Sequence, residues 1–178
     1  ELPLRTPNHF LLNVAPHQVE PLQRFLAARG ITHAGLYPMV PGRIAAVNGA
    51  PPRQEDGEEL NLDREFNLTW SDTLPADNRI SAGRWWGADA GAEVSVEAGV
   101  ARALGLATGD RLTIQVGADR FDVVLTSVRE LDWDTMRPNF FLMFPRQVLE
   151  KQAGMWITSF YLEPERKLVL NELVREFP

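Results

Sequence analysis

The stretch "EVSVEAGVARALGLATGDRLTIQV", Glu93–Val116, carries the clearest structural signal in the chain. Its first residues predict a short strand that leads into a two-turn helix with apolar residues at helical spacing. The inward-facing residues of this helix are Val100, Ala101 and Leu104. Ser95 is a candidate N-cap, and Glu97 in the first turn complements the positive end of the helix dipole. We therefore expect a strand–helix unit that begins near Glu93.

A tight turn and a hairpin follow this helix. Gly105 is expected to end the helix, and the Asp110 carboxylate is expected to hydrogen-bond the backbone of its own "ATGD" loop. The next stretch, "RLTIQV", alternates apolar and polar residues, and a short "GAD" turn joins it to "RFDVVLTSV". The middle of the chain, residues 63–137, is therefore predicted to be a β-rich lobe with one small helix.

The two ends of the chain predict a different kind of structure. Strand patterns occur near His9–Val14, Asn139–Phe144 and Trp156–Leu162, and helix patterns near Gln18–Arg29 and Glu165–Glu176. The apolar run "NFFLMF" suits a strand that is buried on both faces. We expect these three strands to lie in one sheet that the two helices cover.

The remaining region connects these parts. Two further strands are expected around a Pro41–Gly42 turn, and the polar, acidic stretch Gly49–Asp63 is typical of a linker. The predicted fold class is therefore α+β. Both chain ends, residues 1–62 and 138–178, would form an α/β lobe, and residues 63–137 would form a smaller β-rich lobe inserted into it.

The composition narrows the functional classes. Hydrophobic residues make up 44% and charged residues 24% of the 178 residues, as in ordinary globular domains. The net charge of −6, with basic residues that are not clustered, argues against nucleic acid as a partner. The absence of cysteine excludes disulfides, thiolate zinc sites and a cysteine nucleophile. No apolar run approaches the roughly 18–20 residues that span a bilayer. The abrupt ends, "ELPLRTPNHF" and "VREFP", lead us to expect an excised piece of a longer protein.

The sequence lacks the common catalytic motifs. No pair among His9, His17 and His33 has the i,i+4 spacing beside a glutamate that a zinc protease needs. There is no G-x-S-x-G, and "GLATGDRL" lacks the G-K-[ST] of a phosphate-binding loop. We predict no catalytic residue, no metal and no cofactor.

One acidic pair leaves a hydrolytic alternative open. In "DWD", Asp132 and Asp134 would share one face of a strand, as the carboxylates of a glycosidase or of a metal site do. The other interpretation is a solvated strand edge beside a buried Trp133.

The adjacent tryptophans in "ISAGRWW", Ile80–Trp86, are the remaining signal. Neighbours in a strand point to opposite faces, so one packed core cannot easily hold both rings. We expect one ring to be buried in the β-rich lobe and the other to lie at a boundary, which is either the seam between the lobes or an exposed contact surface. The glycine after Trp86 favours Trp86 as the boundary ring.

Several motifs, in order along the chain, carry a resemblance. They are "REFNLTW", "LPADN" with "AGRWW", "VSVEAGVARALGLATGD", "DWDTMRPNFFLMFP" and "TSFYL". Together they resemble the extracytoplasmic (periplasmic) domain of FtsX/MacB-type ABC transporter permeases, within them the second large periplasmic domain of the YbbP-like branch. The resemblance covers the chain from about Asn8 to Pro178.

The resemblance implies a fold and a role. It implies a porter-like α/β lobe with an inserted β-rich lobe, placed between two transmembrane helices of a bacterial inner-membrane protein. Such domains are not enzymes: a separate cytoplasmic ABC ATPase subunit hydrolyses ATP, and the periplasmic domain moves in response. The YbbP-like branch further implies a periplasmic partner of lysophospholipase or thioesterase type and a lipid-like or hydrophobic substrate. The transmembrane helices and the other periplasmic domain are missing from these residues.

The leading hypothesis is thus a non-catalytic periplasmic domain that transmits conformational change and contacts a substrate or partner. Its candidate interaction surface comprises Trp85, Trp86, Asp132, Trp133 and Arg137. Two alternatives stay open, a small hydrolase that uses Asp132 and Asp134, and a stand-alone β-barrel binding module unrelated to transport.

Overall fold

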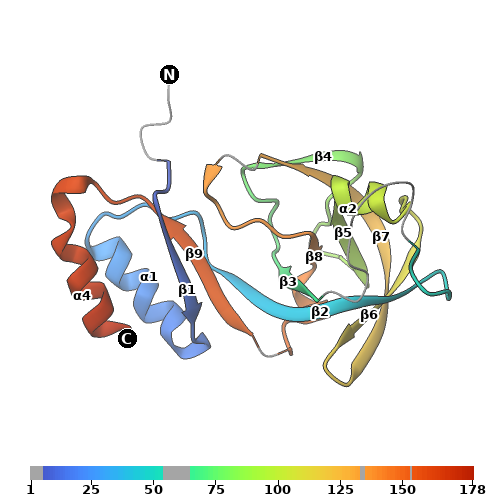
Figure 1. The fold of residues 1–178 in the computed structure, drawn as a ribbon, viewed down its shortest axis with the longest axis horizontal. Helices are drawn as coiled ribbons and strands as arrows, with labels where there is room; N and C mark the ends of the chain where they lie inside the picture. Colours follow the sequence, from blue (N-terminus) through green and yellow to red (C-terminus); the bar gives the residue numbers. More distant parts are fainter. Residues whose placement is uncertain (1–5, 54–64, 133–134, 153) are drawn as a thin grey trace. The chain divides into compact units, whose positions relative to one another are not determined.

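The computed structural model of the chain describes residues 6–53, 65–132, 135–152 and 154–178 (Figure 1). The chain divides into two compact units. The end unit contains the described residues of Glu1–Pro38, Trp133–Pro138 and Gly154–Pro178, and the barrel unit contains those of Met39–Asp132 and Asn139–Ala153. The fold is α+β and rich in strands, as expected.

Seven strands and two short helices build the barrel unit. The strands are β2 (Tyr37–Val47), β3 (Phe66–Trp70), β4 (Asn78–Gly83), β5 (Glu93–Glu97), β6 (Arg111–Val116), β7 (Asp119–Leu131) and β8 (Leu142–Phe144). The helices are α2 (Ala98–Ala103) and α3 (Arg146–Leu149).

Six of these strands close into a ring. The pairings run β2–β3–β8–β5–β7–β6 and return to β2, with β3–β8 and β5–β7 parallel and the other pairs antiparallel. β4 pairs with the far end of the long strand β7. Closure leaves the six ring strands without a free edge and encloses their inward side chains. The enclosed core includes Val40, Ile44, Phe66, Leu68, Val94, Val96, Leu112, Ile114, Val123, Leu125, Leu142 and Phe144.

The expected turn at Pro41–Gly42 is absent, and both residues lie inside the continuous strand β2. Gly42 marks the place where β2 changes partner, because Gly42 pairs with Phe66 of β3 and Arg43 pairs with Gln115 of β6. A Cβ atom on Gly42 would lie 2.5 Å from Leu68 Cδ1. Close packing at a corner of the barrel thus favours glycine here, and the residue does not reverse the chain.

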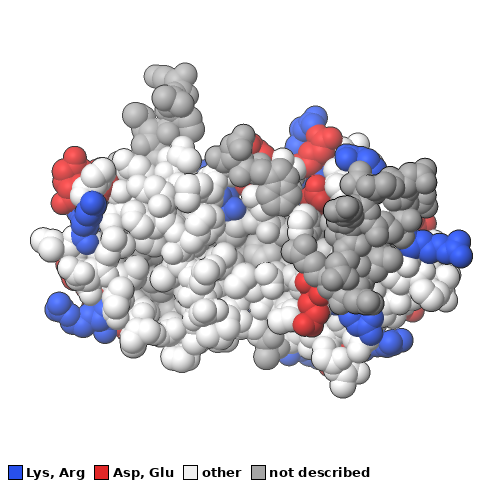
Figure 2. All heavy atoms as spheres, in the orientation of Figure 1, with Lys and Arg blue, Asp and Glu red and all other residues white. Residues whose placement is uncertain are grey.

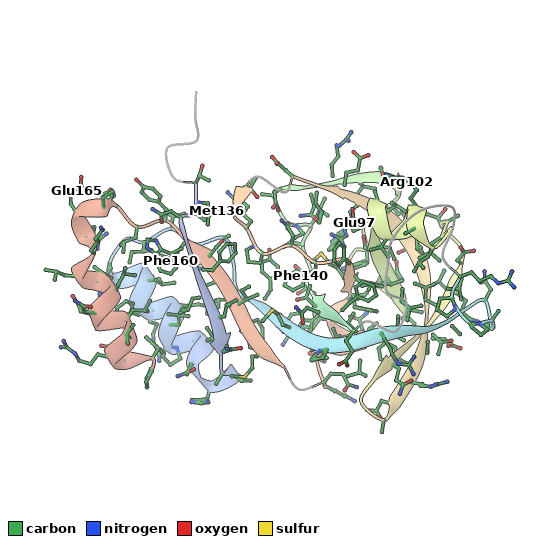
Figure 3. The ribbon with its side chains drawn as sticks, viewed as in Figure 1. Glu97, Arg102, Met136, Phe140, Phe160 and Glu165 are labelled. Atoms are coloured by element: carbon green, nitrogen blue, oxygen red, sulfur yellow. The ribbon has the colours of Figure 1, made fainter. Side chains whose placement is uncertain are left out.

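The strand–helix unit near Glu93 forms as predicted, with one correction. Glu97 is the N-cap of α2, and its carboxylate accepts hydrogen bonds from the backbone of Gly99 at 2.7 Å and Val100 at 2.9 Å (Figure 3). Ser95, the expected cap, is buried in β5. The expected bond within the "ATGD" loop is confirmed, since Asp110 Oδ2 accepts from the Ala107 amide at 2.9 Å.

The strand predicted at Asn139–Phe144 joins the barrel rather than the chain ends. Its ordered part, β8, is fully buried and lies between β3 and β5. β8 is thus not a direct neighbour of β1 or β9, which pair with each other. The expected burial of this strand on both faces is confirmed. The β-rich part is also larger than expected, because β2 and β8, from outside residues 63–137, complete the ring.

The end unit combines both ends of the chain. β1 (His9–Val14) pairs antiparallel with β9 (Met155–Phe160). α1 (Val19–Ala28), with the 3-10 turn Pro16–Gln18 before it, and α4 (Leu168–Glu176), with the 3-10 turn Pro164–Arg166 before it, lie side by side (Figure 1). The helices are linked by Arg29 and Glu172 at 2.8 Å and by the edge-to-face rings of Phe25 and Phe177. Their shared core with the strands includes Leu22, Leu26, Phe160 and Leu173.

A buried arginine joins four segments of the barrel unit. Arg129 of β7 is fully buried. Its guanidinium donates to Asn78 Oδ1 at 2.6 Å, to Ser95 Oγ at 2.8 Å and to the backbone oxygen of Phe140 at 2.8 Å. Burial lowers the pKa of Arg129 to about 10, against the raising effect of Glu97 and Asp77. The side chain therefore stays charged at neutral pH, and its acceptors compensate for lost hydration.

We expect Arg129→Met to destabilise the chain strongly. Several buried acceptors would lose their donor, at about 1–3 kcal/mol for each group left unsatisfied, so the total loss should be about 3 kcal/mol or more. Urea unfolding measures this value. The matched control is Arg79→Met on β4, whose side chain is 76% exposed and pairs with Glu130; this change should stay within about 0.5 kcal/mol. Equal effects of the two substitutions would contradict the assigned role of Arg129.

Candidate functional site

The loop between β4 and β5 carries the tryptophan pair, and we call residues Arg84–Ala90 the tryptophan loop. It begins directly after Gly83, whose φ is +72°. A Cβ atom at this position would lie 2.0 Å from the backbone oxygen of Thr126. The Arg84 amide donates to the same oxygen at 3.1 Å. The loop therefore leaves the sheet at a position that only glycine accommodates.

The two indole rings are held by the backbone beneath them. Trp85 Nε1 donates to the backbone oxygen of Asp72, and Trp86 Nε1 donates to that of Ser71, each at 3.0 Å. The rings stack on each other with centroids 4.0 Å apart and planes inclined by 29°. Trp86 is 7% exposed, whereas Trp85 is half-buried. Both polar atoms of the pair are thus satisfied, as is usual for buried indoles.

Two parts of the expectation for this pair were wrong. The rings do not face opposite ways, because residues 84–87 lie outside any strand and period-two alternation does not apply. The buried ring is Trp86, which the following glycine had favoured as the boundary ring. The more exposed ring is Trp85, stacked on its neighbour.

Two hollows flank the tryptophan loop, and both lie within the barrel unit. The larger, of about 430 Å³, is lined by Asp72, Trp86, Gly87, Ala88, Ala90, Pro145 and Gln147. The smaller, of about 270 Å³, is lined by Arg84, Trp85, Trp86, Gly87, Ala88, Asp89, Ala90 and Glu93. The larger falls within the size range of small-molecule sites, about 300–1,000 Å³. Its lining combines an indole ring, a proline and small residues with the polar side chains of Asp72 and Gln147, which makes it a candidate binding site.

The segment before α3 closes the larger hollow. The Gln147 amide donates to the backbone oxygen of Ala90 and so ties α3 to the loop. Ser71, which precedes the lining residue Asp72, is held by β8, because its backbone amide donates to the backbone oxygen of Phe144 at 3.1 Å. Four residues near the hollow were not predicted from the sequence, namely Ser71, Asp72, Pro145 and Gln147. No sequence motif identifies them, because they come close to the tryptophan loop only through the pairing of β3 with β8.

Asp132, the other described residue of the predicted interaction surface within the barrel unit, lies away from the tryptophan loop. Asp132 is exposed, and its backbone amide donates to the backbone oxygen of Asp77, the residue just before β4. The tryptophan loop follows the other end of β4, after Gly83. Arg137 is half-buried and belongs to the end unit. Trp133 and Asp134 lie outside the described residues, so the geometry of the acidic pair is not defined.

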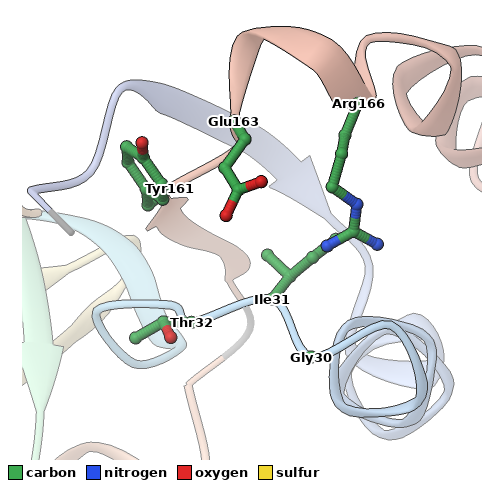
Figure 4. Close-up of a pocket in the computed structure, with 6 residues that line it drawn as sticks. All are labelled: Gly30, Ile31, Thr32, Tyr161, Glu163 and Arg166. Atoms are coloured by element: carbon green, nitrogen blue, oxygen red, sulfur yellow. The ribbon is translucent and has the colours of Figure 1, made fainter. Parts of the chain in front are cut away.

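The end unit contains a smaller hollow of about 90 Å³ (Figure 4). Its lining is Gly30, Ile31, Thr32, Tyr161, Glu163 and Arg166. The Glu163 and Arg166 side chains both reach toward this space, so their opposite charges offset each other (Figure 4). Its size and balanced charge make it a weaker candidate than the hollow beside Trp86.

Two histidines of the end unit, His9 and His33, make contacts within that unit. The His9 ring stacks on Phe160 at 5.3 Å, and His33 Nδ1 accepts from the Gly35 amide at 3.1 Å. Burial lowers the pKa of His33. Among the described residues, no group of three or more His, Asp or Glu side chains could hold a metal ion.

On the face that Figure 2 shows, the charged side chains of the end unit gather over α4.

We expect the two tryptophans to differ in their contribution to stability. Trp86→Ala should lower the free energy of unfolding by about 3–5 kcal/mol, the range for emptying a large buried aromatic site. Trp85→Ala should lower it by about 1–2 kcal/mol, because that ring is only half-buried and loses mainly a stacked contact. Denaturant unfolding of both variants measures the difference. Equal, large losses would show that both rings are plain core.

The chain is similar in sequence to a known protein. It is 42% identical over all 178 residues to YbbP, an uncharacterised ABC transporter permease of Escherichia coli (strain K12). No protein-family model matches the chain. A crystal structure of a permease domain from Porphyromonas gingivalis aligns with 93% of this chain and 76% of its own, at 14% identity and a TM-score of 0.44. That likeness is too distant to carry an argument.

The similarity to YbbP confirms the resemblance found in the sequence motifs. The chain spans 22% of the length of that permease. No described helix is long and apolar enough to cross a membrane. Along its whole length, this chain is similar to a part of the ABC transporter permease YbbP.

Proposed function

We propose that the chain is a non-catalytic periplasmic domain of a bacterial inner-membrane ABC transporter permease. It transmits conformational change and contacts a substrate or partner. The observation that carries this proposal is the 42% identity to the permease YbbP over all 178 residues.

The two units suit such a role. The end unit is assembled from both ends of the chain, so β1 and α1 pack with β9 and α4. A force applied at either end would reach the same small core. We propose that this unit is the porter-like lobe, and that the barrel unit with its tryptophan loop is the contact element.

The proposed partners follow from the same relationship. An ABC permease works with a cytoplasmic ATPase subunit, which would act through membrane segments outside these residues. A periplasmic partner of lysophospholipase or thioesterase type and a lipid-like substrate belong to the proposal as well. Trp85, Trp86, Asp132, Trp133 and Arg137 remain its candidate contact residues.

We expect ATP binding by the intact transporter to change the distance between the two units. The chain has no cysteine, so Lys167→Cys in the end unit and Lys151→Cys in the barrel unit, both at exposed positions, accept spin labels without background from this region. Electron–electron distance measurements in the full permease with its ATPase should then show a shift when ATP is added.

The matched control pair lies within the barrel unit, with labels at Lys151→Cys and Arg79→Cys, and should keep its distance because both positions belong to one compact unit. A distance between Lys167 and Lys151 that is unchanged by ATP would contradict the proposed transmission of conformational change.

A further inference from the structure

The larger hollow beside the tryptophan loop is shaped before any ligand arrives. Its indole wall is fixed, because Trp86 donates to Ser71 and stacks on Trp85. Its opposite wall is fixed by Gln147, which donates to Ala90. A preformed site loses little conformational freedom on binding, which favours affinity for a small ligand.

The charges around this hollow favour a cation. No Lys, Arg or His side chain is among its lining residues. Asp72 is exposed, and its carboxylate has no hydrogen-bond or ion-pair partner among the residues that the structure describes. The neighbouring hollow adds Asp89 and Glu93 against the single cation Arg84. An anionic ligand would therefore meet repulsion, and a cation would meet an unpaired carboxylate.

The walls specify what kind of cation fits. The described lining offers one carboxylate and one amide, too few oxygen ligands for a bare metal ion. Indole and proline rings and three small residues form the rest of the surface. Aromatic rings attract organic ammonium groups, and the apolar part of the lining accommodates their alkyl substituents.

We infer that this hollow binds an organic ammonium group with apolar substituents, placed between the Asp72 carboxylate and the indole of Trp86. The inference rests on the proposed role of the tryptophan loop as a contact element. The ammonium group could belong to a small soluble amine or to the headgroup of an amphiphile, and both present the same chemistry to the site.

The test is a titration of the ¹⁵N-labelled 178-residue chain, followed by NMR through the indole N–H signals of Trp85 and Trp86. The probe is choline, and its neutral isostere 3,3-dimethylbutan-1-ol has the same shape without the charge. Choline should cause saturable shifts at these two signals, and the isostere should bind at least about fivefold more weakly, the effect of one unit charge near 4 Å in surroundings close to water.

The matched variants are Asp72→Asn and Asp89→Asn, because Asp89 lines only the neighbouring hollow. Asp72→Asn should weaken choline binding by about fivefold or more, and Asp89→Asn should leave it within about twofold, since a more distant exposed charge is screened. Asp72→Ser serves as a second variant. Both Asp72 variants keep the backbone oxygen that accepts from Trp85, so the indole signals of the free protein should persist.

Three outcomes would overturn the inference: no saturable shift with choline, equal binding of choline and its isostere, or equal effects of Asp72→Asn and Asp89→Asn. Dodecyltrimethylammonium below its micelle-forming concentration separates the two sources of the ammonium group. Tighter binding than choline assigns the headgroup of an amphiphile, and equal binding assigns a small amine. The distance measurement on the full transporter does not involve this ligand, so failure of the site and failure of the proposed function give different results.

Discussion

Burial of the Arg129 guanidinium is the constraint on which the barrel unit depends. A charged group without water must find acceptors, and here they come from β4, β5 and the segment before β8. Asn78 is held in turn by its neighbour, because the Asn78 side-chain amide donates to the Asp77 carboxylate at 2.9 Å. Such a network contributes less to net stability than its number of bonds suggests, since desolvation opposes it. An arrangement of these segments that broke the bonds would leave buried polar groups unsatisfied.

The pairing of these strands also sets the position of the tryptophan loop. β4 lies against β7 through a ladder that includes Ile80 opposite Arg129 and Gly83 opposite Ser127. The loop starts where this ladder ends, and the steric demand at Gly83 sets its direction. The backbone oxygens that receive the two indole N–H groups follow β3, which β8 holds in place. The candidate site is therefore assembled from three separate parts of the sequence on a rigid barrel.

The geometry of the tryptophan loop bears on its proposed role as a contact element. The indole N–H groups are already used, so the rings offer surface rather than hydrogen bonds to a ligand. Among the described residues that line the larger hollow, Asp72 is the only carboxylate. In the proposed function, this hollow on the barrel unit would recognise a molecule, and the end unit, built from both chain ends, would respond to movement.

The sequence by itself determined the local structure, because the relevant forces act between near neighbours. It predicted the α+β class, the α2 helix with its stop at Gly105, the Asp110 loop bond and the buried strand β8. Its motifs also indicated the relationship to YbbP-like permeases. The tertiary structure alone decided the partner of each strand. Gly42 looked like a turn residue and became a barrel corner, β8 joined β3 and β5, and Trp86 became the buried ring. Ring closure brings distant segments together at positions that no short window of sequence encodes, and the site beside Trp86 arises from that closure.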